Sequence, residues 1–372
     1  MQKTHIKALI VAGESSGDIH AAKLVVALRG LAPDSEFFGS AGPKMREAGV
    51  HPVVKADDLS IVGLAEIGRA LPMFMRAMRR IRSAARAEKP DVAILVDFPD
   101  FNLKLAKHLK KEGIPIVYYI SPQLWAWRQY RISTVKKYVD LMITILPFEK
   151  AWYEARGVKH VEYAGNPLAR EVFATETRDG FFERHDLDPS RRLIALLPGS
   201  RGKEISRILP AMLETAKLMP DVQFVVALNR KLSDRYQIPG NAQVVRDETY
   251  NALAASDAAA VTSGTATLEA GLLGTPMCVV YKTSKLNYSL FEPMIDVPHY
   301  GLINLIAEER LFTELIQHDC TAGSMKSELE RLLDPEVNGA LRQKLKLVAD
   351  KLGRGGASKR AAQAVLKLVR DA

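Results

Sequence analysis

Short apolar segments rich in valine and isoleucine alternate with amphipathic segments along most of the chain. They occupy residues 6–13, 92–98, 114–121 and 141–147 in the first half, and 193–199, 222–228, 242–245, 258–264 and 277–282 in the second. Continuous apolar runs separated by helical patterns indicate parallel β-strands that are buried on both faces of a sheet. The pattern therefore predicts an α/β fold.

The predicted strands form two series, separated by a polar, proline-containing segment near residues 166–192. Because 372 residues exceed the usual size of one hydrophobic core, we expect two domains. Each is predicted to be a doubly wound, Rossmann-like parallel sheet, and the two are expected to face each other across a cleft. The predicted boundaries are residues 1–168, residues 190–345, and a C-terminal helical segment at residues 346–372.

Composition narrows the class of protein. A hydrophobic content of 47% with 26% charged residues is typical of a globular protein. The net charge of +9 favours an anionic partner, which could be a nucleotide, a nucleic acid or an acidic lipid surface. No nucleic-acid-binding module accompanies this charge, so we expect no nucleic acid partner. With no signal peptide and no apolar run long enough to span a membrane, the expected location is cytoplasmic.

Ligands of parallel sheets bind beyond the carboxyl ends of the strands, so the residues that follow each predicted strand are candidate site residues. The turn at residues 12–18 contains Glu14, Ser16 and Gly17, and the next helix is expected to begin near Ile19. A hydroxylated group such as a sugar suits this turn, because Glu14 would repel a phosphate. The alternative is a plain strand-to-helix turn in which serine or aspartate side chains cap the helix.

Two aspartates follow the predicted strand at residues 92–98. Asp97 ends the strand, where its carboxylate would face the ligand and act as a general base. Asp100 precedes a helical pattern, so its simplest role is an N-cap. A structural role for both aspartates is the alternative. Trp127, in the segment SPQLWAWR, is expected to pack against a sugar or an acyl group. The alternative is that it packs in a domain interface.

Two turns of the second predicted domain have the character of phosphate-binding loops. Their candidate residues are Gly199, Ser200, Arg201, Ser263, Gly264 and Thr265. Each turn opens a helix, whose N-terminus attracts an anion, and Arg201 can donate to a diphosphate. Glu269 lies about one turn further along the second helix, where it can hold the hydroxyls of a ribose. The alternative is a capped helix with a solvent-facing Glu269.

Seven segments of the chain resemble, in the same order, the motifs of the lipid-A-disaccharide synthase family. They are AGESSGD, DFPDFN, SPQLWAWR, LPFEK, LPGSRGKEI, SGTATLE and INLIAEERLFTELIQHDCT, which together span about 310 residues. The two phosphate-binding turns also resemble the nucleotide-sugar-binding half of the GT-B glycosyltransferases. The resemblance implies a GT-B-like fold.

The activity that the resemblance implies is an inverting glycosyl transfer. A 2,3-diacylglucosamine unit leaves its UDP conjugate and joins the 6-hydroxyl of 2,3-diacylglucosamine 1-phosphate, which gives a β-1,6-linked tetraacyl disaccharide 1-phosphate and UDP. Asp97 matches the family's base and Arg201 its phosphate-contacting arginine. Glu269 matches the nucleotide-binding glutamate, and Asn304 an active-site asparagine. Asn166 stands where relatives commonly carry histidine, so only a hydrogen-bonding role is expected there.

No metal or other cofactor is expected, because no acidic pair has the spacing of a metal–diphosphate site and basic groups can neutralise the leaving group. A homodimer is implied by analogy with relatives. One alternative is another GT-B enzyme, either a nucleotide-sugar epimerase or a transferase acting on undecaprenyl-linked sugars. The other is a nucleic-acid-binding protein, which only the net charge supports.

The segment ALPMFMRAMRRIR at residues 70–82 mixes apolar and basic side chains. A helix that begins at Pro72 would place an apolar stripe on one face and Met73 on the polar side. Alone, this pattern indicates a core helix. With acylated substrates, we expect residues 61–80 to receive acyl chains and to contact the anionic, cytoplasmic face of the inner membrane. The expected contact residues are Val62, Leu64, Ile67, Leu71, Met73, Phe74 and Met75.

Overall fold

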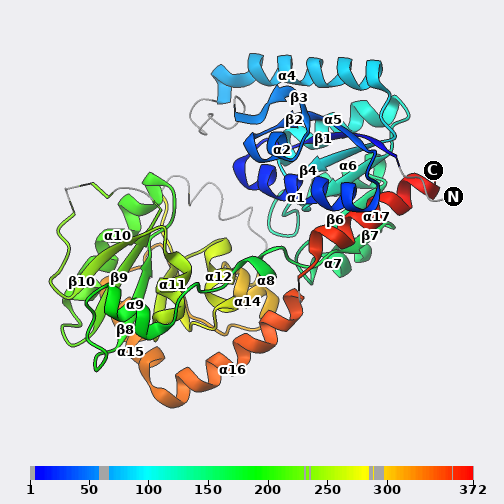
Figure 1. Cartoon of the computed structure of the whole chain (residues 1–372). Helices are drawn as coiled ribbons and strands as arrows, with labels where there is room; N and C mark the ends of the chain where they lie inside the picture. Colours follow the sequence, from blue (N-terminus) through cyan, green and yellow to red (C-terminus); the bar gives the residue numbers. More distant parts are fainter. Residues whose placement is uncertain are drawn as a thin grey trace. The chain divides into compact units, whose positions relative to one another are not determined.

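The chain divides into two compact units, residues 1–167 with 355–372, and residues 168–354 (Figure 1). The computed structural model describes residues 5–57, 67–229, 232–233, 236–284, 288, 297–353 and 355–371. Each unit is built on one parallel β-sheet with helices, so the predicted fold class of two Rossmann-like domains is confirmed. The cleft expected between the domains stays a prediction.

The first unit contains a seven-stranded sheet in the order β3-β2-β1-β4-β5-β6-β7. Its strands are β1 (Lys7–Val11), β2 (Glu36–Ala41), β3 (His51–Lys55), β4 (Val92–Val96), β5 (Ile116–Tyr119), β6 (Leu141–Thr144) and β7 (Val161–Tyr163). The sequence pattern predicted β1, β4, β5 and β6, which are the continuous apolar strands. It missed β2, β3 and β7, because they contain glycine, proline or charged residues, or are only three residues long.

Helices cover both faces of this first sheet. They are α1 (Ser15–Leu31), α2 (Pro43–Glu47), α4 (Ile67–Glu88), α5 (Pro99–Lys111), η2 (Gln129–Arg131), α6 (Ile132–Tyr138), α7 (Glu149–Ala155) and α17 (Ala357–Asp371). One buried cluster joins α1 and α17 to the sheet, and a second joins α4, α5 and α6 to it. Figure 1 shows α17, at the C-terminal end of the chain, lying with the first unit, where it packs against α1. The predicted segment 346–372 is therefore shared between the two units.

Helix α4 differs in two respects from the sequence prediction. It begins at Ile67 and keeps Pro72 inside the helix, whereas the predicted start was Pro72. The buried face runs through Ala77 and Ile81, and Met73 packs partly against the same core, so its predicted polar placement is wrong. Compared with the prediction, the helix is rotated about its axis, which places side chains four residues apart against the core. The burial of these side chains offsets the backbone hydrogen bond that Pro72 cannot donate.

The second unit contains a six-stranded sheet in the order β10-β9-β8-β11-β12-β13. Its strands are β8 (Leu193–Leu197), β9 (Gln223–Leu228), β10 (Ala242–Arg246), β11 (Ala258–Thr262), β12 (Met277–Tyr281) and β13 (Glu314–Ile316). Its helices are α8 (Leu168–Glu171), α9 (Arg178–Arg184), α10 (Gly202–Lys217), α11 (Thr249–Ala255), α12 (Thr265–Leu272), α14 (Leu302–Ala307), α15 (Ala322–Leu333) and α16 (Pro335–Leu352). Five of the six strands were predicted. The three-residue β13 was not, because it is too short to show a pattern.

Each sheet reverses its strand order at one point. In the first unit the reversal lies between β1 and β4, where Val11 pairs with Leu95. In the second it lies between β8 and β11, where Leu197 pairs with Val261. The loops that leave two neighbouring strands in opposite directions open a crevice, which is where doubly wound sheets bind ligands.

Candidate active site

The reversal point of the first unit brings together the turn after β1 and the aspartate after β4. Asp97 follows β4 directly, and its backbone is left-handed with φ 48°. Burial, and to a smaller extent the charge of Glu14, raise the pKa of Asp97 to about 6. A hydrogen bond from the backbone of Phe98 acts in the opposite direction and lowers this pKa. Such a carboxyl changes its protonation close to neutral pH, which suits a general base.

Two side chains that the sequence analysis missed hold Asp97 in place. The amide nitrogen Nδ2 of Asn102 donates to the carbonyl oxygen of Asp97 at 2.8 Å, and the buried Tyr118 hydroxyl donates to the same oxygen at 2.7 Å. Nδ2 of Asn102 also lies 3.2 Å from the carbonyl oxygen of Val96. These bonds fix a backbone conformation that a non-glycine residue seldom adopts. The signal in the sequence was an asparagine one turn into the helix after DFPD.

The turn after β1 is shorter than predicted. Helix α1 begins at Ser15, not near Ile19, and Glu14 is its N-cap residue without a side-chain hydrogen bond. The exposed Glu14 and Ser16 stand at this end of the helix, while Gly17 is buried. Asp18 does not cap this helix, because its carboxylate accepts hydrogen bonds from the backbone N–H groups of Lys44 and Met45 instead.

Asp100 is the second residue of α5, whose N-cap is Phe98, so the predicted N-cap role of Asp100 is wrong. It belongs instead to a set of ion pairs at the start of this helix. Its carboxylate accepts from Arg131 and lies 3.0 Å from Nη1 of Arg128, and its side chain is largely exposed. The Arg128 guanidinium stacks on the half-buried ring of Trp127, with 4.1 Å from Cζ to the ring centroid. Asp100 is therefore already paired with two cations, whereas Asp97 has no cationic neighbour among the causes of its shifted pKa. This contrast favours Asp97 as the base.

A buried glutamate anchors the loop that carries Trp127. Glu149, at the start of α7, accepts from Oγ of Ser121 at 2.7 Å and from Nε1 of Trp125 at 3.0 Å. It also accepts the backbone N–H of Leu146 at 3.0 Å. Burial raises the pKa of Glu149, and these donors oppose that rise. The carboxylate thus links the loops that follow β5 and β6, which gives the glutamate of the motif LPFEK a structural role.

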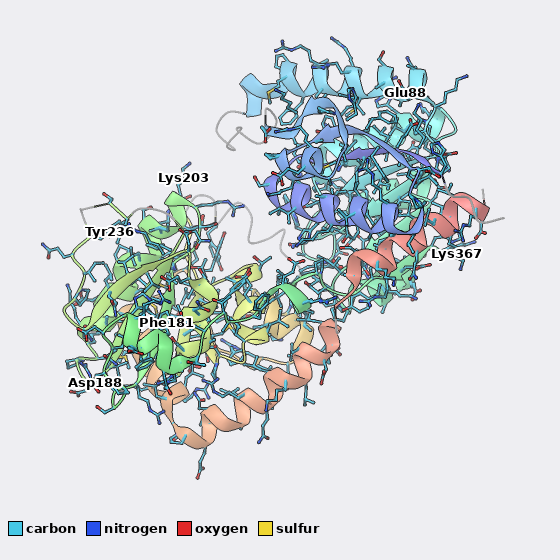
Figure 2. The ribbon with its side chains drawn as sticks, in the orientation of Figure 1. Glu88, Phe181, Asp188, Lys203, Tyr236 and Lys367 are labelled. Atoms are coloured by element: carbon cyan, nitrogen blue, oxygen red, sulfur yellow. The ribbon has the colours of Figure 1, made fainter. Side chains whose placement is uncertain are left out.

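In the second unit, the two predicted phosphate-binding turns leave neighbouring strands. Gly199 has φ 101°, a conformation that favours glycine. Arg201 is the N-cap residue of α10; its guanidinium lies 3.0 Å from Glu204, and its side chain is 80% exposed. The exposed Ser200 lies between them. Figure 2 labels Lys203 at this same end of α10.

The second turn leads into α12. Gly264 is its N-cap residue, Thr265 begins the helix, and Oγ of Ser263 donates to the carbonyl oxygen of Tyr300 at 2.8 Å. Glu269 is half-buried, so it is not the solvent-facing residue of the alternative interpretation. Burial raises the pKa of Glu269, and a hydrogen bond from Tyr250 opposes that rise.

Asn304 is buried and fully engaged within the second unit. Its Nδ2 donates to the carbonyl oxygen of Phe312 at 2.8 Å and to Glu314 at 2.9 Å, and its Oδ1 accepts the Phe312 N–H at 3.0 Å. Glu314 also accepts the N–H groups of Tyr300 and Gly301. Asn304 therefore positions the loop before α14. Asn166 is buried at the end of the first unit.

The predicted lipid-contacting residues fall into three groups. Leu71 and Met75 are 55% and 48% exposed. Met73 and Phe74 are half-buried, and they pack against the core of the first unit. Val62 and Leu64, and the side chain of Ile67, lie outside the described residues. Within the described ranges, no helix combines the length and the apolar character needed to cross a bilayer.

Comparison with known proteins identifies the family. The Lipid-A-disaccharide synthetase family matches residues 8–368. The chain is 42% identical over 374 residues to the lipid-A-disaccharide synthase of Trichlorobacter lovleyi, a match that covers 98% of this chain and 97% of that protein.

Solved structures share the fold. The S. aureus MnaA-UDP co-structure is similar with a TM-score of 0.67 at 15% identity, over 98% of this chain and 97% of that one. The calicheamicin glycosyltransferase CalG4 is similar with a TM-score of 0.63 at 14% identity, over 100% and 99%. At these identities the likeness shows the GT-B-like fold alone. Through the family match, the chain belongs to the lipid-A-disaccharide synthetases and is a glycosyltransferase of lipid A biosynthesis.

Proposed function

We propose that the enzyme transfers 2,3-diacylglucosamine from its UDP conjugate to the 6-hydroxyl of 2,3-diacylglucosamine 1-phosphate, with inversion at the anomeric carbon. Asp97 takes the proton of the acceptor hydroxyl as its oxygen attacks the anomeric carbon. The bond to the diphosphate breaks in the same step, and UDP leaves. The observation that carries this proposal is the position of the Asp97 carboxyl directly after β4, at the reversal point of the first sheet, where burial raises its pKa to about 6.

The first unit is assigned to the acceptor and the second to the UDP sugar. Three features support the nucleotide assignment: the paired turns after β8 and β11, the two helix N-termini that follow them, and the exposed Arg201. A helix N-terminus and a forked guanidinium both stabilise a diphosphate, whose negative charge grows as it leaves. Glu269 lies one turn into α12, within reach of a ribose on that turn. The MnaA structure, with the same fold, carries UDP.

The reaction is testable with purified protein. Incubation with both acylated substrates should give the tetraacyl disaccharide 1-phosphate by mass spectrometry and a β-1,6 linkage by NMR. A water-soluble acceptor without acyl chains should release far less UDP. Formation of an α-linked product would contradict inversion, and equal use of the soluble acceptor would contradict the acylated substrate class.

The fall of kcat/KM at acidic pH, which forms the acidic limb of the pH profile, should shift when Glu14 is substituted. Because Asp97 acts as a base only when ionised, kcat/KM should fall as the pH drops below about 6. The charge of Glu14 raises the pKa of Asp97, so Glu14→Gln should move the limb to lower pH. Burial is the larger cause, so the limb should stay above the value of an exposed aspartate. A limb that moves to higher pH in Glu14→Gln would contradict this coupling.

We infer that the enzyme is peripheral on the cytoplasmic face of the inner membrane and attaches through α4. Leu71 and Met75 are exposed beside the basic side chains of this helix, so they can enter a lipid surface. The double variant Leu71→Ser and Met75→Ser should lose most of its binding to anionic vesicles in a sedimentation assay. Its melting temperature should change little, because neither side chain is part of the core. Undiminished vesicle binding would move the membrane contact away from α4.

A further inference from the structure

A cavity of about 490 Å³ lies between α5 and the η2–α6 segment of the first unit. The residues that carry the argument are Asp100, Lys104, Lys107, Arg131, Lys137 and Tyr138, all of which line it. Its rim begins at Pro99, two residues after Asp97. None of these residues has a role in the proposed reaction.

The cavity carries an excess of positive charge. Among the described residues, Lys104, Lys107 and Lys137 form no ion pair, and the Lys137 ammonium lies over the Tyr138 ring. The neighbouring Lys110 of α5 is paired with Asp140, which follows α6. Asp100 is the one carboxylate among the described residues that line the cavity, and it is already engaged by Arg128 and Arg131. Three unneutralised ammonium groups around one hollow repel one another, and an anion would relieve that repulsion.

The two flanks of α5 have opposite character. Toward α4, the rings of Phe74, Phe98 and Phe101 form one cluster, with centroid distances of 5.5–6.3 Å. Toward α6 lies the cationic cavity. Asp97, at the start of this arrangement, is adjacent in sequence to Phe98. Helix α5 thus carries an aromatic cluster on one flank and exposed ammonium groups on the other, a combination that fits an amphiphile carrying an anion.

We propose that this cavity binds the phosphate of the acceptor, a phosphomonoester on the anomeric carbon of the acylated sugar. This inference rests on the proposed function, which supplies the acceptor. A phosphomonoester carries close to two negative charges at neutral pH and has three oxygens for the ammonium groups to donate to. The hydroxyl of Thr134 lines the same hollow and adds a further donor, whereas that of Ser133 donates to the carbonyl oxygen of Tyr130. The cavity thereby selects an acceptor that bears the phosphate over one that lacks it.

The test compares two charge-matched triple variants. The cavity variant is Lys104→Gln, Lys107→Gln and Lys137→Gln. The control variant is Lys111→Gln, Lys136→Gln and Lys159→Gln, which removes the same charge from the same unit outside the cavity. All six lysines are exposed, so both variants should keep the melting temperature of the wild type.

The measured quantity is the ratio of kcat/KM for the acceptor to kcat/KM for the same acylated sugar without its phosphate. In the cavity variant this ratio should fall about 10- to 100-fold, because the KM for the phosphorylated acceptor rises when charge-assisted hydrogen bonds are removed. The control variant should keep the ratio of the wild type. An unchanged ratio in the cavity variant, or an equal loss in the control, overturns the proposal.

Binding to phosphatidylglycerol vesicles separates the acceptor phosphate from a bilayer phosphate. The cavity and control variants should bind these vesicles equally. A selective loss of vesicle binding in the cavity variant, with the acceptor ratio intact, overturns the proposal in favour of a bilayer headgroup. A wild-type enzyme that forms no disaccharide refutes the proposed function instead. In that case the proposal is tested by the equilibrium binding of the phosphorylated acceptor in detergent micelles. The cavity variant should bind this acceptor more weakly than the wild type, and the control variant should bind it equally well.

Discussion

Asp97→Asn is expected to lower kcat about 10²- to 10⁴-fold, the usual contribution of a general base. Asparagine keeps the size of the side chain and the backbone carbonyl that accepts from Asn102 and Tyr118. The loss should therefore come from the missing base, and KM for both substrates should change little. Steady-state kinetics with the two acylated substrates measure both parameters. An Asp97→Asn enzyme with full activity would remove Asp97 from the mechanism.

The same substitution should stabilise the fold. The pKa of Asp97 is about 6 in the folded state and about 3.9 in an unfolded chain, so folding is opposed once the carboxyl ionises. This penalty is absent below pH 4, grows between pH 4 and 6, and is fully present above pH 6. Asparagine stays neutral, so Asp97→Asn should raise the free energy of unfolding by about 1–3 kcal/mol at pH 7.5. Urea unfolding at pH 4.5 should show a gain of only about a third of that at pH 7.5.

Asp100→Asn tells the two aspartates apart. Asp100 is largely exposed and paired with Arg128 and Arg131, so it lacks the environment of a base. Its substitution should cost less than about 10-fold in kcat, which is below the range of general-base catalysis. It should also give no gain in stability at pH 7.5. A larger loss of kcat in Asp100→Asn than in Asp97→Asn would assign the base to Asp100.

The sequence was sufficient for the architecture and for placing most candidate residues in the loops that follow strands, while their roles stay predictions. Continuous apolar runs of valine, isoleucine and leucine such as β4 and β8, separated by helical patterns, indicate buried parallel strands, and the loops that follow them meet at the sheet reversal points. Asp97 and Arg201 could be found in this way because each directly follows such a strand or its turn.

What the sequence could not supply was the partner of each polar side chain. Asn102 and Glu314 each bind backbone groups from segments that are distant in sequence or lie across a turn, so no local pattern marks them. Asn304 is predicted as a substrate contact from its motif, and no local pattern shows that its side chain is hydrogen-bonded to Phe312 and Glu314. The rotation of α4 was equally hidden, because it depends on which side chains find room in the core.

Arg201→Gln is the second substitution with a large expected effect. Arg201 is 80% exposed, and within the described part of the chain its one ion pair is with Glu204 at the start of α10, so its loss should cost the fold little. Its proposed contact with the diphosphate is worth far more, because the charge on that group grows in the transition state. We expect kcat/KM for the UDP sugar to fall about 10²- to 10³-fold, as when a single transition-state donor is removed. Lys203→Gln, at the same end of α10 (Figure 2), is the matched control and should lose less than about 5-fold, the size of an exposed, nonspecific charge effect.

Glu204 offers a test of the same contact in the opposite direction. Its carboxylate holds Arg201 and also accepts the backbone N–H of that residue, so a bound diphosphate must compete with it for the guanidinium. Glu204→Gln keeps an acceptor for the N–H but removes the negative charge. UDP should therefore bind more tightly to Glu204→Gln and more weakly to Arg201→Gln, and calorimetry with UDP alone measures both. If both variants bind UDP as the wild type does, Arg201 does not contact the diphosphate, and the leaving group is stabilised by the helix N-termini of α10 and α12 alone.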